Sequence, residues 1–551
     1  MKSVLQRVSF PAWPARFRSL LRLGWPGAML SGATLALLLF LPAPLGVLAP
    51  LPLAALHRRL ARSPNGRAAF RQAFTFALAF FVLHLAWLPL SMAGVLGPLG
   101  GLLTVLVLPA AALTWAVPLA LTRWVFGART LLALPFMWVI LEVLRAGGPL
   151  AFPWGAPGYA LVDTPLAQLA SLGGVSLLTL LVTVTASVLA ALGSRRHPGL
   201  VLALLSVWSM ALLWSWRGAP QPTRTAVLVQ GAIDPRVKAQ GRTLEELNIY
   251  LDLTRRALSR GPADLVVWPE TASPLPASDP RVLGPLRNLG VPVLLGAPGD
   301  VPGQARNSAY SVDGRVTGRQ DKRVLVPFGE SLPFAGTLGF LYTPVLSGLG
   351  MPGYISATPG RVLNVLPLRD LRVGVSICYE SVFPALSRQA VRAGANLLVV
   401  ISNDAWFGRG PGAEQHFRMG RLRAIETGRY LLRAGNDGVS AVVDPWGRVV
   451  FRAPRGERAA YRAPFGVVST RTPFVRYGDW VLAGSAVLLL ALLSGRFSGG
   501  KKPEARGPLL TVGEHALGRA DDAEDRYGRL EAWSGHLEKP RRVWRGLRGD
   551  G

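Results

Sequence analysis

Before Arg217 the sequence alternates long apolar runs with short basic clusters, and from there onward it has the mixed polarity of a soluble domain. A helix needs about 20 apolar residues to cross the hydrocarbon core of a bilayer. The uncharged segment Gly24–Leu56 is too long for one helix and is interrupted by proline and glycine, so it predicts two short spans. The other predicted spans are Ala73–Leu90, Leu99–Leu121, Thr130–Leu144, Leu166–Leu192, Leu200–Trp216 and Trp480–Leu493.

The basic clusters between these runs predict how the chain crosses the membrane. Lysine and arginine concentrate in cytoplasmic loops. With two helices in Gly24–Leu56, the clusters before the first span and after the second, fourth and sixth spans all fall on one side. Seven spans before Arg217 then place the next domain outside the cytoplasm, and an eighth returns the chain inward. We therefore expect about eight spans in a multi-pass α-helical membrane domain, with both termini cytoplasmic.

Strand-like and helix-like runs alternate from Thr223 to about Arg476, which indicates an α/β layered domain. The predicted strands are Thr225–Ile233, Asp264–Trp268, Val291–Gly296, Ala309–Val312, Leu371–Ile377, Asn396–Ser402 and Val439–Val443, and the predicted helices are Thr243–Ser259, Pro384–Ala393 and Ala413–Arg429. We expect four parts: a membrane domain (1–217), the α/β domain (218–478), a C-terminal membrane helix (479–496) and a charged, disordered cytoplasmic tail (497–551).

Charge and cysteine content exclude two other kinds of protein. Many of the basic residues behind the net charge of +29 lie in short loops between apolar runs, as membrane topology requires, and no nucleic-acid-binding motif accompanies them. We therefore expect no nucleic-acid partner. Cys378 is the single cysteine of the chain, which excludes an intrachain disulfide and a multi-cysteine metal site. We expect neither a metal nor a cofactor.

Polar residues that end apolar strands are the candidate chemistry, because sites in α/β domains gather at the carboxyl ends of strands. Cys378 follows such a strand and precedes a helix, where a thiolate can be stabilised and can form a thioester. His416 is the only histidine of the domain, so Glu270 is a better candidate for the base than a histidine. We expect its apolar surroundings to raise the pKa of Glu270. Lys322 is a cationic donor for a tetrahedral oxyanion.

Each of these residues also has a structural alternative. An isolated cysteine such as Cys378 is more often inert core than a nucleophile. Glu270 can cap the segment that follows it, and Lys322 can be an ordinary surface lysine. Glu330 can pair with Arg323. Spacing along the chain does not bring these side chains together, so both interpretations remain open at this level.

The settings of the three candidates resemble a known family. Glu270 in Trp-Pro-Glu, Lys322 in Asp-Lys-Arg and Cys378 in Cys-Tyr-Glu resemble the Glu-Lys-Cys triad of the nitrilase superfamily, which implies an α-β-β-α sandwich over most of 223–476. Joined to the predicted spans, the pattern resembles the apolipoprotein N-acyltransferase family. Further similar motifs are Val229–Gly231, Phe328–Glu330, Ser402–Gly408, Gln415-His416, Arg421–Arg433 and the loop Phe152–Gly155, which is either a Pro/Gly turn with an interfacial tryptophan or part of a lipid entrance.

That resemblance implies a ping-pong acyl transfer in a bacterial plasma membrane, with the α/β domain on the extracytoplasmic face. Glu270 is then the general base, Cys378 the nucleophile and Lys322 the oxyanion donor. The implied supporting active-site residues are Glu330, Tyr379 and Glu380. The implied partners are a phospholipid acyl donor, phosphatidylethanolamine in particular, and diacylated apolipoproteins. A tryptophan that the family can carry is replaced near Ala239, which affects mobile-loop contacts with lipid.

Two other functions fit parts of the pattern. A membrane-tethered amidase would use the same triad with water as acceptor, but a single anchor would serve it. A transporter or lipid-binding protein would need no intact triad, and charged residues within the predicted spans are scarce for a transport path.

Overall fold

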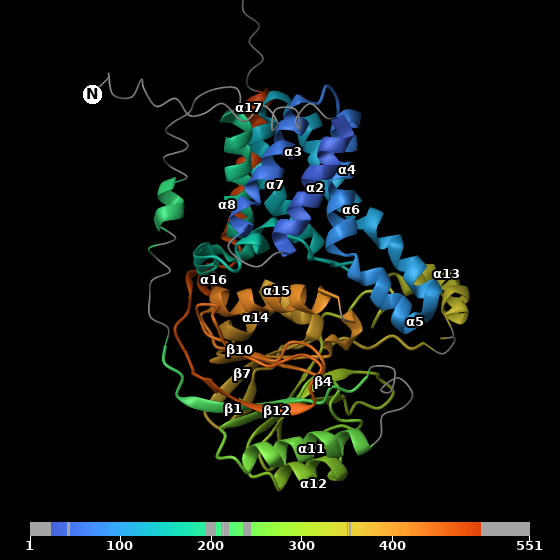
Figure 1. Ribbon diagram of the computed structural model, residues 1–551, viewed down its shortest axis with the longest axis vertical. Coiled ribbons are helices and arrows are strands. Elements are labelled where there is room, and N and C mark those ends of the chain that lie inside the picture. Colours follow the sequence, from blue (N-terminus) through green and yellow to red (C-terminus); the bar gives the residue numbers. More distant parts are fainter. Residues whose placement is uncertain are drawn as a thin grey trace, which may run out of the picture. The chain divides into compact units, whose positions relative to one another are not determined.

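The computed structural model describes residues 24–40, 45–192, 205–210, 213, 220–234, 244–349, 351, 354–408 and 410–497 (Figure 1). Most of the predicted span Leu200–Trp216, the replaced position near Ala239 and the tail after Phe497 lie outside these residues.

Helices make up the first part of the chain. They are α2 (Gly24–Phe40), α3 (Pro50–Arg62), α4 (Gly66–His84), α5 (Trp87–Val105), α6 (Val107–Phe126), α7 (Thr130–Arg145) and α8 (Ala170–Leu192), with α16 (Pro473–Tyr477) and α17 (Trp480–Phe497) after the α/β domain. Two helical stretches, Leu96–Arg145 and Pro165–Leu192, are long and apolar enough to cross a membrane. The bent pair formed by α4 and the start of α5 is a third candidate. The predicted count of eight spans stays a prediction.

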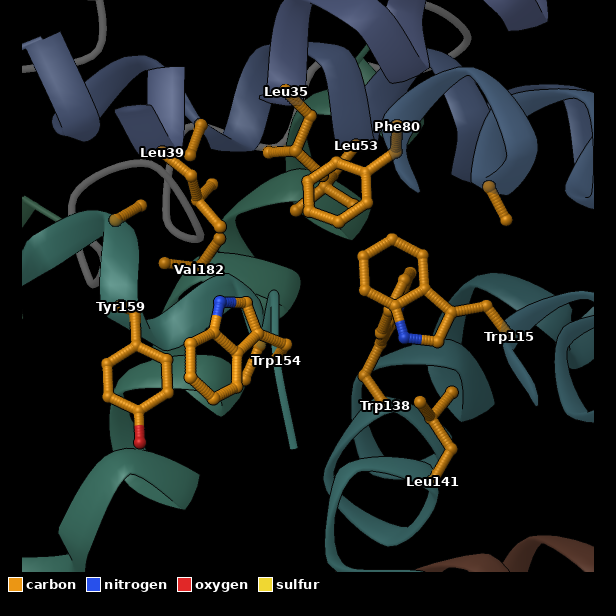
Figure 2. Close-up of a cluster of buried hydrophobic side chains, with 14 of the residues drawn as sticks. Leu35, Leu39, Leu53, Phe80, Trp115, Trp138, Leu141, Trp154, Tyr159 and Val182 are labelled. Atoms are coloured by element: carbon orange, nitrogen blue, oxygen red, sulfur yellow. The ribbon is translucent and has the colours of Figure 1, made fainter. Parts of the chain in front are cut away.

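Aliphatic and aromatic side chains together fill the core of the helical region (Figure 2). Phe80 stacks on Trp115 with ring centroids 4.7 Å apart, and Trp115 meets Trp138 edge to face at 4.8 Å. His57, a buried polar side chain in this core, is paired through both ring nitrogens, as expected where an unpaired polar group is costly. Trp138 donates from Nε1 to Nε2 of His57 at 2.9 Å, and the other ring nitrogen of His57 lies 2.9 Å from Ser187 Oγ.

The α/β domain contains two six-stranded sheets. The first has the order β12 (Ala459–Phe465), β1 (Arg224–Gln230), β2 (Leu265–Val267), β3 (Val293–Pro298), β4 (Asn307–Val312), β5 (Val316–Asp321). The second has the order β11 (Val449–Arg452), β10 (Ala441–Val443), β9 (Leu431–Gly435), β8 (Leu397–Ser402), β7 (Leu371–Ile377), β6 (Leu366–Leu368). All seven predicted strands exist, and β5, β6, β9, β11 and β12 are additional.

Side-chain alternation along the strands divides the domain into four layers. Leu228 of β1 and Val399 of β8 belong to the core between the sheets, whereas their neighbours Val229 and Val400 face the outer helices. The outer layers are α11 (Leu244–Leu258) with α12 (Pro280–Arg287) on the first sheet, and α14 (Pro384–Arg392) with α15 (Gly412–Thr427) on the second (Figure 1). This is the predicted α-β-β-α sandwich.

Helix α15 differs from an ordinary surface helix because it is buried on both sides. Phe417 and Ala424 pack into the core against the second sheet. Met419, Leu422 and Ile425 of the same helix belong to the apolar core of the helical region. Helix α15 therefore contributes side chains to both the core of the sandwich and the core of the helical region. The remaining helix, α13 (Ala335–Gly348), has no buried residue and follows Glu330 closely.

Candidate active site

The three predicted site residues lie at strand ends that meet between the two sheets. Glu270 follows β2 by three residues, Lys322 directly follows β5, and Cys378 directly follows β7. The antiparallel pairing of β4 with β5 places the end of β5 beside Asn307, the first residue of β4. Gly296 on β3 permits the close approach of the Glu270 loop, since a Cβ there would lie 2.7 Å from the Cα of Glu270. Neighbouring strands thus bring together residues that are far apart in sequence.

Glu270 is buried, and both of its carboxylate oxygens accept hydrogen bonds. Oε1 accepts from Lys322 Nζ at 3.1 Å and from Asn307 Nδ2 at 2.7 Å, and Oε2 accepts from the backbone N–H of Asn403 at 2.9 Å. Burial by itself would raise the pKa of Glu270, but the Lys322 ammonium and these hydrogen bonds outweigh it and hold the pKa below its usual value. The predicted rise in this pKa is therefore wrong, because the prediction considered the apolar strand and not the partners.

Lys322 is only 1% exposed, which excludes the surface-lysine alternative. Its Nζ lies between two carboxylates, 3.1 Å from Glu270 and 2.8 Å from Glu330. Burial opposes the charge, but the two carboxylates raise the pKa of Lys322 well above its usual value, so the side chain stays an ammonium. Glu330 pairs with this lysine rather than with Arg323, whose guanidinium donates to Gln389. We call Glu270, Asn307, Lys322 and Glu330 the lysine cluster.

Cys378 is partly exposed and has a backbone φ of +53°, a conformation that non-glycine residues rarely adopt and that is common at functional sites. Burial and the Glu270 charge raise the pKa of its thiol, while Lys322 opposes this rise. The thiol is therefore protonated at neutral pH and needs a base. Its position at the start of a 3₁₀ turn, Cys378–Val382, agrees with the predicted strand-to-helix junction.

Glu380 and Tyr379 bond to backbone groups rather than to the side chains of the lysine cluster. The carboxylate of Glu380 accepts the backbone N–H of Ile377 at 2.8 Å and that of Arg323 at 2.6 Å, so it connects the residue before Cys378 to the residue after Lys322. The Tyr379 hydroxyl donates to the carbonyl of Ala151 at 2.6 Å. Both side chains thus hold backbone segments that flank the site.

A second buried network, the histidine cluster, contains Ser402, Asp404, His416 and Arg433. Asp404 pairs with Arg433 at 2.8 Å and accepts from Ser402 Oγ at 2.6 Å. His416 lies 3.0 Å from Asp404 through Nδ1 and 3.0 Å from the carbonyl oxygen of Cys378 through Nε2. Burial and the Arg433 charge lower the pKa of His416, so the ring is neutral. The only histidine of the domain therefore contacts the backbone of the cysteine.

Sequence reasoning missed Asn307, which contacts both carboxylates of the lysine cluster at 2.7 Å and 3.4 Å. It also missed the roles of Asp404 and Arg433. The run Ser402–Gly408 gave a signal for Asp404, since it follows a buried strand. Asn307 begins a strand in an unremarkable polar stretch, and only the pairing of β4 with β5 brings it to Lys322.

The loop Phe152–Gly155 reaches the α/β sandwich. Trp154 is buried, so the alternative of an interfacial tryptophan is wrong. Its ring lies almost parallel to that of Tyr379, with centroids 6.2 Å apart, and its Nε1 donates to Gln415 Oε1 at 2.9 Å. The same oxygen accepts from Trp87 Nε1 at 2.9 Å. Gln415 thus joins two membrane-side segments to α15, next to His416.

Comparison with known proteins gives consistent matches. Residues 225–463 match the carbon-nitrogen hydrolase family, and residues 31–188 match the apolipoprotein N-acyltransferase N-terminal domain. The chain is 35% identical to an apolipoprotein N-acyltransferase of Azotobacter vinelandii, over 86% of this chain and 96% of that protein. The chain is also 33% identical to an apolipoprotein N-acyltransferase of Geobacter metallireducens, over 84% of this chain and 94% of that protein. Among solved structures, a nitrilase-superfamily amidase of Nesterenkonia aligns with a TM-score of 0.35 and 19% identity, over 49% of this chain and 99% of that chain.

Proposed function

This chain belongs to the apolipoprotein N-acyltransferase family, and on that premise we propose that Cys378 carries an acyl chain as a thioester between two membrane-bound substrates. The protein is an acyltransferase of lipoprotein maturation that acts on apolipoproteins with a phospholipid donor. The observation that carries the proposal is the lysine cluster beside a lone cysteine in a strained backbone conformation.

Glu270 acts as the general base in both half-reactions. It accepts the thiol proton as Cys378 Sγ bonds to the ester carbonyl of the phospholipid, and it returns that proton to the lyso-phospholipid oxygen when the ester C–O bond breaks. The α-amine of the diacylglyceryl-cysteine then attacks the thioester and gives a proton to Glu270, and Sγ leaves as the thiol once this proton returns to it. The pKa of Glu270 lies below its usual value, so the carboxylate is ionised at neutral pH and can accept a proton.

Lys322 stabilises the oxyanion of each tetrahedral intermediate. Its raised pKa keeps the positive charge, and its two carboxylate partners fix Nζ before the substrate arrives. A preorganised cation in a site that excludes water stabilises developing charge more than a mobile one does. Glu330 and Asn307 support the reaction by holding Lys322 and Glu270, and Glu380 supports it by tying the loop after Lys322 to the strand before Cys378.

We further propose the finer features expected from the sequence. These are phosphatidylethanolamine as the common donor, domain boundaries at 1–217, 218–478, 479–496 and 497–551, and eight spans that place the sandwich on the extracytoplasmic face of a bacterial plasma membrane. The shared core at α15 supports a sandwich that sits directly on the helical region. Both substrates are membrane-anchored and would reach such a site by diffusion in the bilayer plane. The contact of Tyr379 with Ala151 gives the loop Phe152–Gly155 a route to shape lipid entry.

A label-transfer experiment tests the reaction. Purified protein is incubated with phosphatidylethanolamine carrying a radiolabelled acyl chain, and the adduct is challenged with neutral hydroxylamine, which cleaves thioesters. We expect a hydroxylamine-labile adduct in the wild type and none in Cys378→Ala, with transfer to a diacylated lipopeptide as the second step. Folded wild-type protein that acquires no label from any phospholipid would refute the proposal.

Topology has a separate test because Cys378 is the only cysteine. In the cysteine-free Cys378→Ser background, single cysteines replace the exposed residues Ser278 in the sandwich and Arg67 in the helical region. A maleimide that does not cross membranes should label the first in intact spheroplasts and the second only after lysis. The reverse pattern would place the sandwich in the cytoplasm.

A further inference from the structure

His416 is a buried histidine that the proposed reaction does not use. Its ring has two polar neighbours at each nitrogen. Nδ1 lies 3.0 Å from Asp404 Oδ1 and 3.0 Å from Arg433 Nη2. Nε2 lies 2.9 Å from Ser381 Oγ and 3.0 Å from the carbonyl oxygen of Cys378. Which ring nitrogen carries the hydrogen decides what these contacts can do.

A catalytic Ser-His-Asp triad is one interpretation of these contacts. In such a triad the aspartate accepts from one ring nitrogen, and the serine gives its proton to the other. The order Ser381, His416, Asp404 matches that pattern. A nucleophilic serine must be accessible to its substrate, however, and Ser381 is 0% exposed. Asp404 also accepts from Arg433 Nη2 through both carboxylate oxygens, at 2.9 Å and 2.8 Å. The contacts therefore need another explanation.

The neighbours of the ring favour hydrogen on Nε2. Burial and the Arg433 charge lower the pKa of His416, so the ring is neutral and has one N–H. With hydrogen on Nδ1, the lone pair of Nε2 would face the carbonyl oxygen of Cys378, and Nδ1–H would face the guanidinium of Arg433. With hydrogen on Nε2, the ring donates to that carbonyl and accepts from Arg433. The remaining contact, between Nδ1 and Asp404 Oδ1, is then bridged by Arg433 Nη2, which lies 3.0 Å from the first atom and 2.9 Å from the second.

We propose that His416 is a positioning residue for the nucleophile, whose carbonyl oxygen it holds through Nε2–H while Arg433 keeps the hydrogen on that nitrogen. Strand β7 fixes the chain up to Ile377 by pairing with β8. Cys378 comes next, with a φ of +53°, and its carbonyl is held by His416. Because each peptide unit is planar, holding the chain on both sides of Cys378 fixes its φ and ψ, and with them the direction of its Cα–Cβ bond. A strained conformation of this kind persists only where the surroundings determine it.

The bond between His416 and the carbonyl matters to the reaction because Sγ must meet both Glu270 and the ester carbonyl of the donor. A misplacement of about 1 Å can slow an enzyme by about 10²-fold. His416 acts through the backbone of Cys378 and does not touch the substrate. The positioning role rests on the proposed nucleophile, whereas the place of the hydrogen on the ring does not.

Two substitutions of His416 separate the hydrogen-bond donor from the volume of the ring. The amide nitrogen of glutamine can occupy the place of Nε2 and donate to the carbonyl, whereas methionine fills similar space without a donor. We expect acyl-enzyme formation, measured on folded full-length protein in detergent, to slow about 10²-fold in His416→Met and to stay within about tenfold of the wild type in His416→Gln.

The matched control is His57→Met. His57 is likewise buried and paired through both ring nitrogens, but it lies on α3 in the helical region. Its loss should lower the thermal midpoint and leave acyl-enzyme formation unchanged.

Alkylation by iodoacetamide gives a readout that needs no phospholipid, because Cys378 is the only cysteine of the chain. The alkylation rate should fall in His416→Met and recover in His416→Gln, since the protonated thiol depends on its position beside Glu270 to lose its proton. Protein that shows this pattern but never acquires an acyl label would refute the acyltransferase proposal and not the positioning role.

Nitrogen NMR of the full-length protein, isotopically labelled at histidine, tests the place of the hydrogen directly. The chain has six histidines, and the signals lost in His416→Gln identify those of His416. We expect an unprotonated Nδ1 and a protonated Nε2. A protonated Nδ1 would restore the triad interpretation and overturn the proposal. Equal rates of acyl-enzyme formation in His416→Met and His416→Gln, corrected for the folded fraction, would mean a purely structural histidine and would overturn the proposal as well.

Discussion

The lysine cluster and the histidine cluster are both buried ionic networks that involve Cys378, and they do so in different ways. In the lysine cluster, Glu270 and Lys322 influence the thiol itself, and their charges move its pKa in opposite directions. In the histidine cluster, His416 contacts the carbonyl oxygen of the cysteine, and Asp404 and Arg433 hold the histidine. The histidine cluster also influences the thiol, because Ser402 hydrogen-bonds to it and the Asp404 charge raises its pKa. Burial and charge therefore do not identify a reacting group. The lysine cluster differs because it contains the proposed base and the proposed oxyanion donor.

Exchanging a carboxylate for an amide in each cluster tests this difference, and the largest effect is expected at Glu270. Glu270→Gln removes the base and keeps the shape, so the rate of acyl-enzyme formation should fall by about 10²–10⁴. Lys322 keeps its partner Glu330, so the thermal midpoint should change little. Single-turnover labelling and thermal denaturation in detergent measure the two quantities. A rate within a factor of five of the wild type would remove Glu270 from the reaction.

Asp404→Asn should lower the folding stability strongly and the rate of acyl-enzyme formation only weakly. Arg433 would remain buried without its carboxylate partner, which costs about 3–5 kcal/mol of folding free energy. The folded fraction should still form the acyl-enzyme at a rate within about tenfold of the wild type, because the lysine cluster is intact. If Asp404→Asn leaves stability unchanged and abolishes labelling, the histidine cluster belongs to the chemistry and the distinction fails.

Asn307→Ala should have an intermediate effect within the lysine cluster. It removes a hydrogen bond to the Glu270 carboxylate, a type worth about 1.5–3 kcal/mol, so labelling should slow by about tenfold. Loss of this bond should also raise the pKa of Glu270, so the acid limb of the pH–rate profile should move to higher pH. Asn364→Ala is the control, since Asn364 is exposed and bonds only outside the cluster. An unchanged acid limb would mean that Asn307 only supports the fold.

A third buried pair, Arg423–Glu426, faces neither the thiol nor its carbonyl and should have the smallest effect on labelling. Burial raises the pKa of Glu426 to about 7, with Arg423 opposing. Between the unfolded pKa near 4.5 and this value the folded state binds the proton more tightly, so stability falls as pH rises through that window. Glu426→Gln should reduce the fall of the thermal midpoint between pH 5 and pH 7 by about 2 °C or more. The rate of acyl-enzyme labelling should not change. A wild-type midpoint that rises from pH 5 to 7 relative to the variant would contradict the assignment.

The sequence by itself singled out Glu270, Lys322 and Cys378 as candidates and predicted the two-part architecture. Glu270, Lys322 and Cys378 each carry a local signal, since a polar group follows an apolar strand or precedes a turn, and the strand period is readable over short windows. The long apolar runs likewise predicted helices before Arg217. The strands without such a signal, such as β12, contain small or polar residues and exist because the chain returns to pair with β1.

Only the tertiary structure decided what the partners of each group are. The pairing of β4 with β5 supplies Asn307, the end of β8 supplies the Asn403 amide, and together with Lys322 they hold the pKa of Glu270 low where the local pattern predicted a high one. The burial of α15 on both faces brings Trp154 beside His416, which contacts the carbonyl oxygen of Cys378. The alternation of apolar and polar residues along a strand predicts which side chains face the core. The pKa of a buried group depends on charges and hydrogen-bond partners that are distant in sequence.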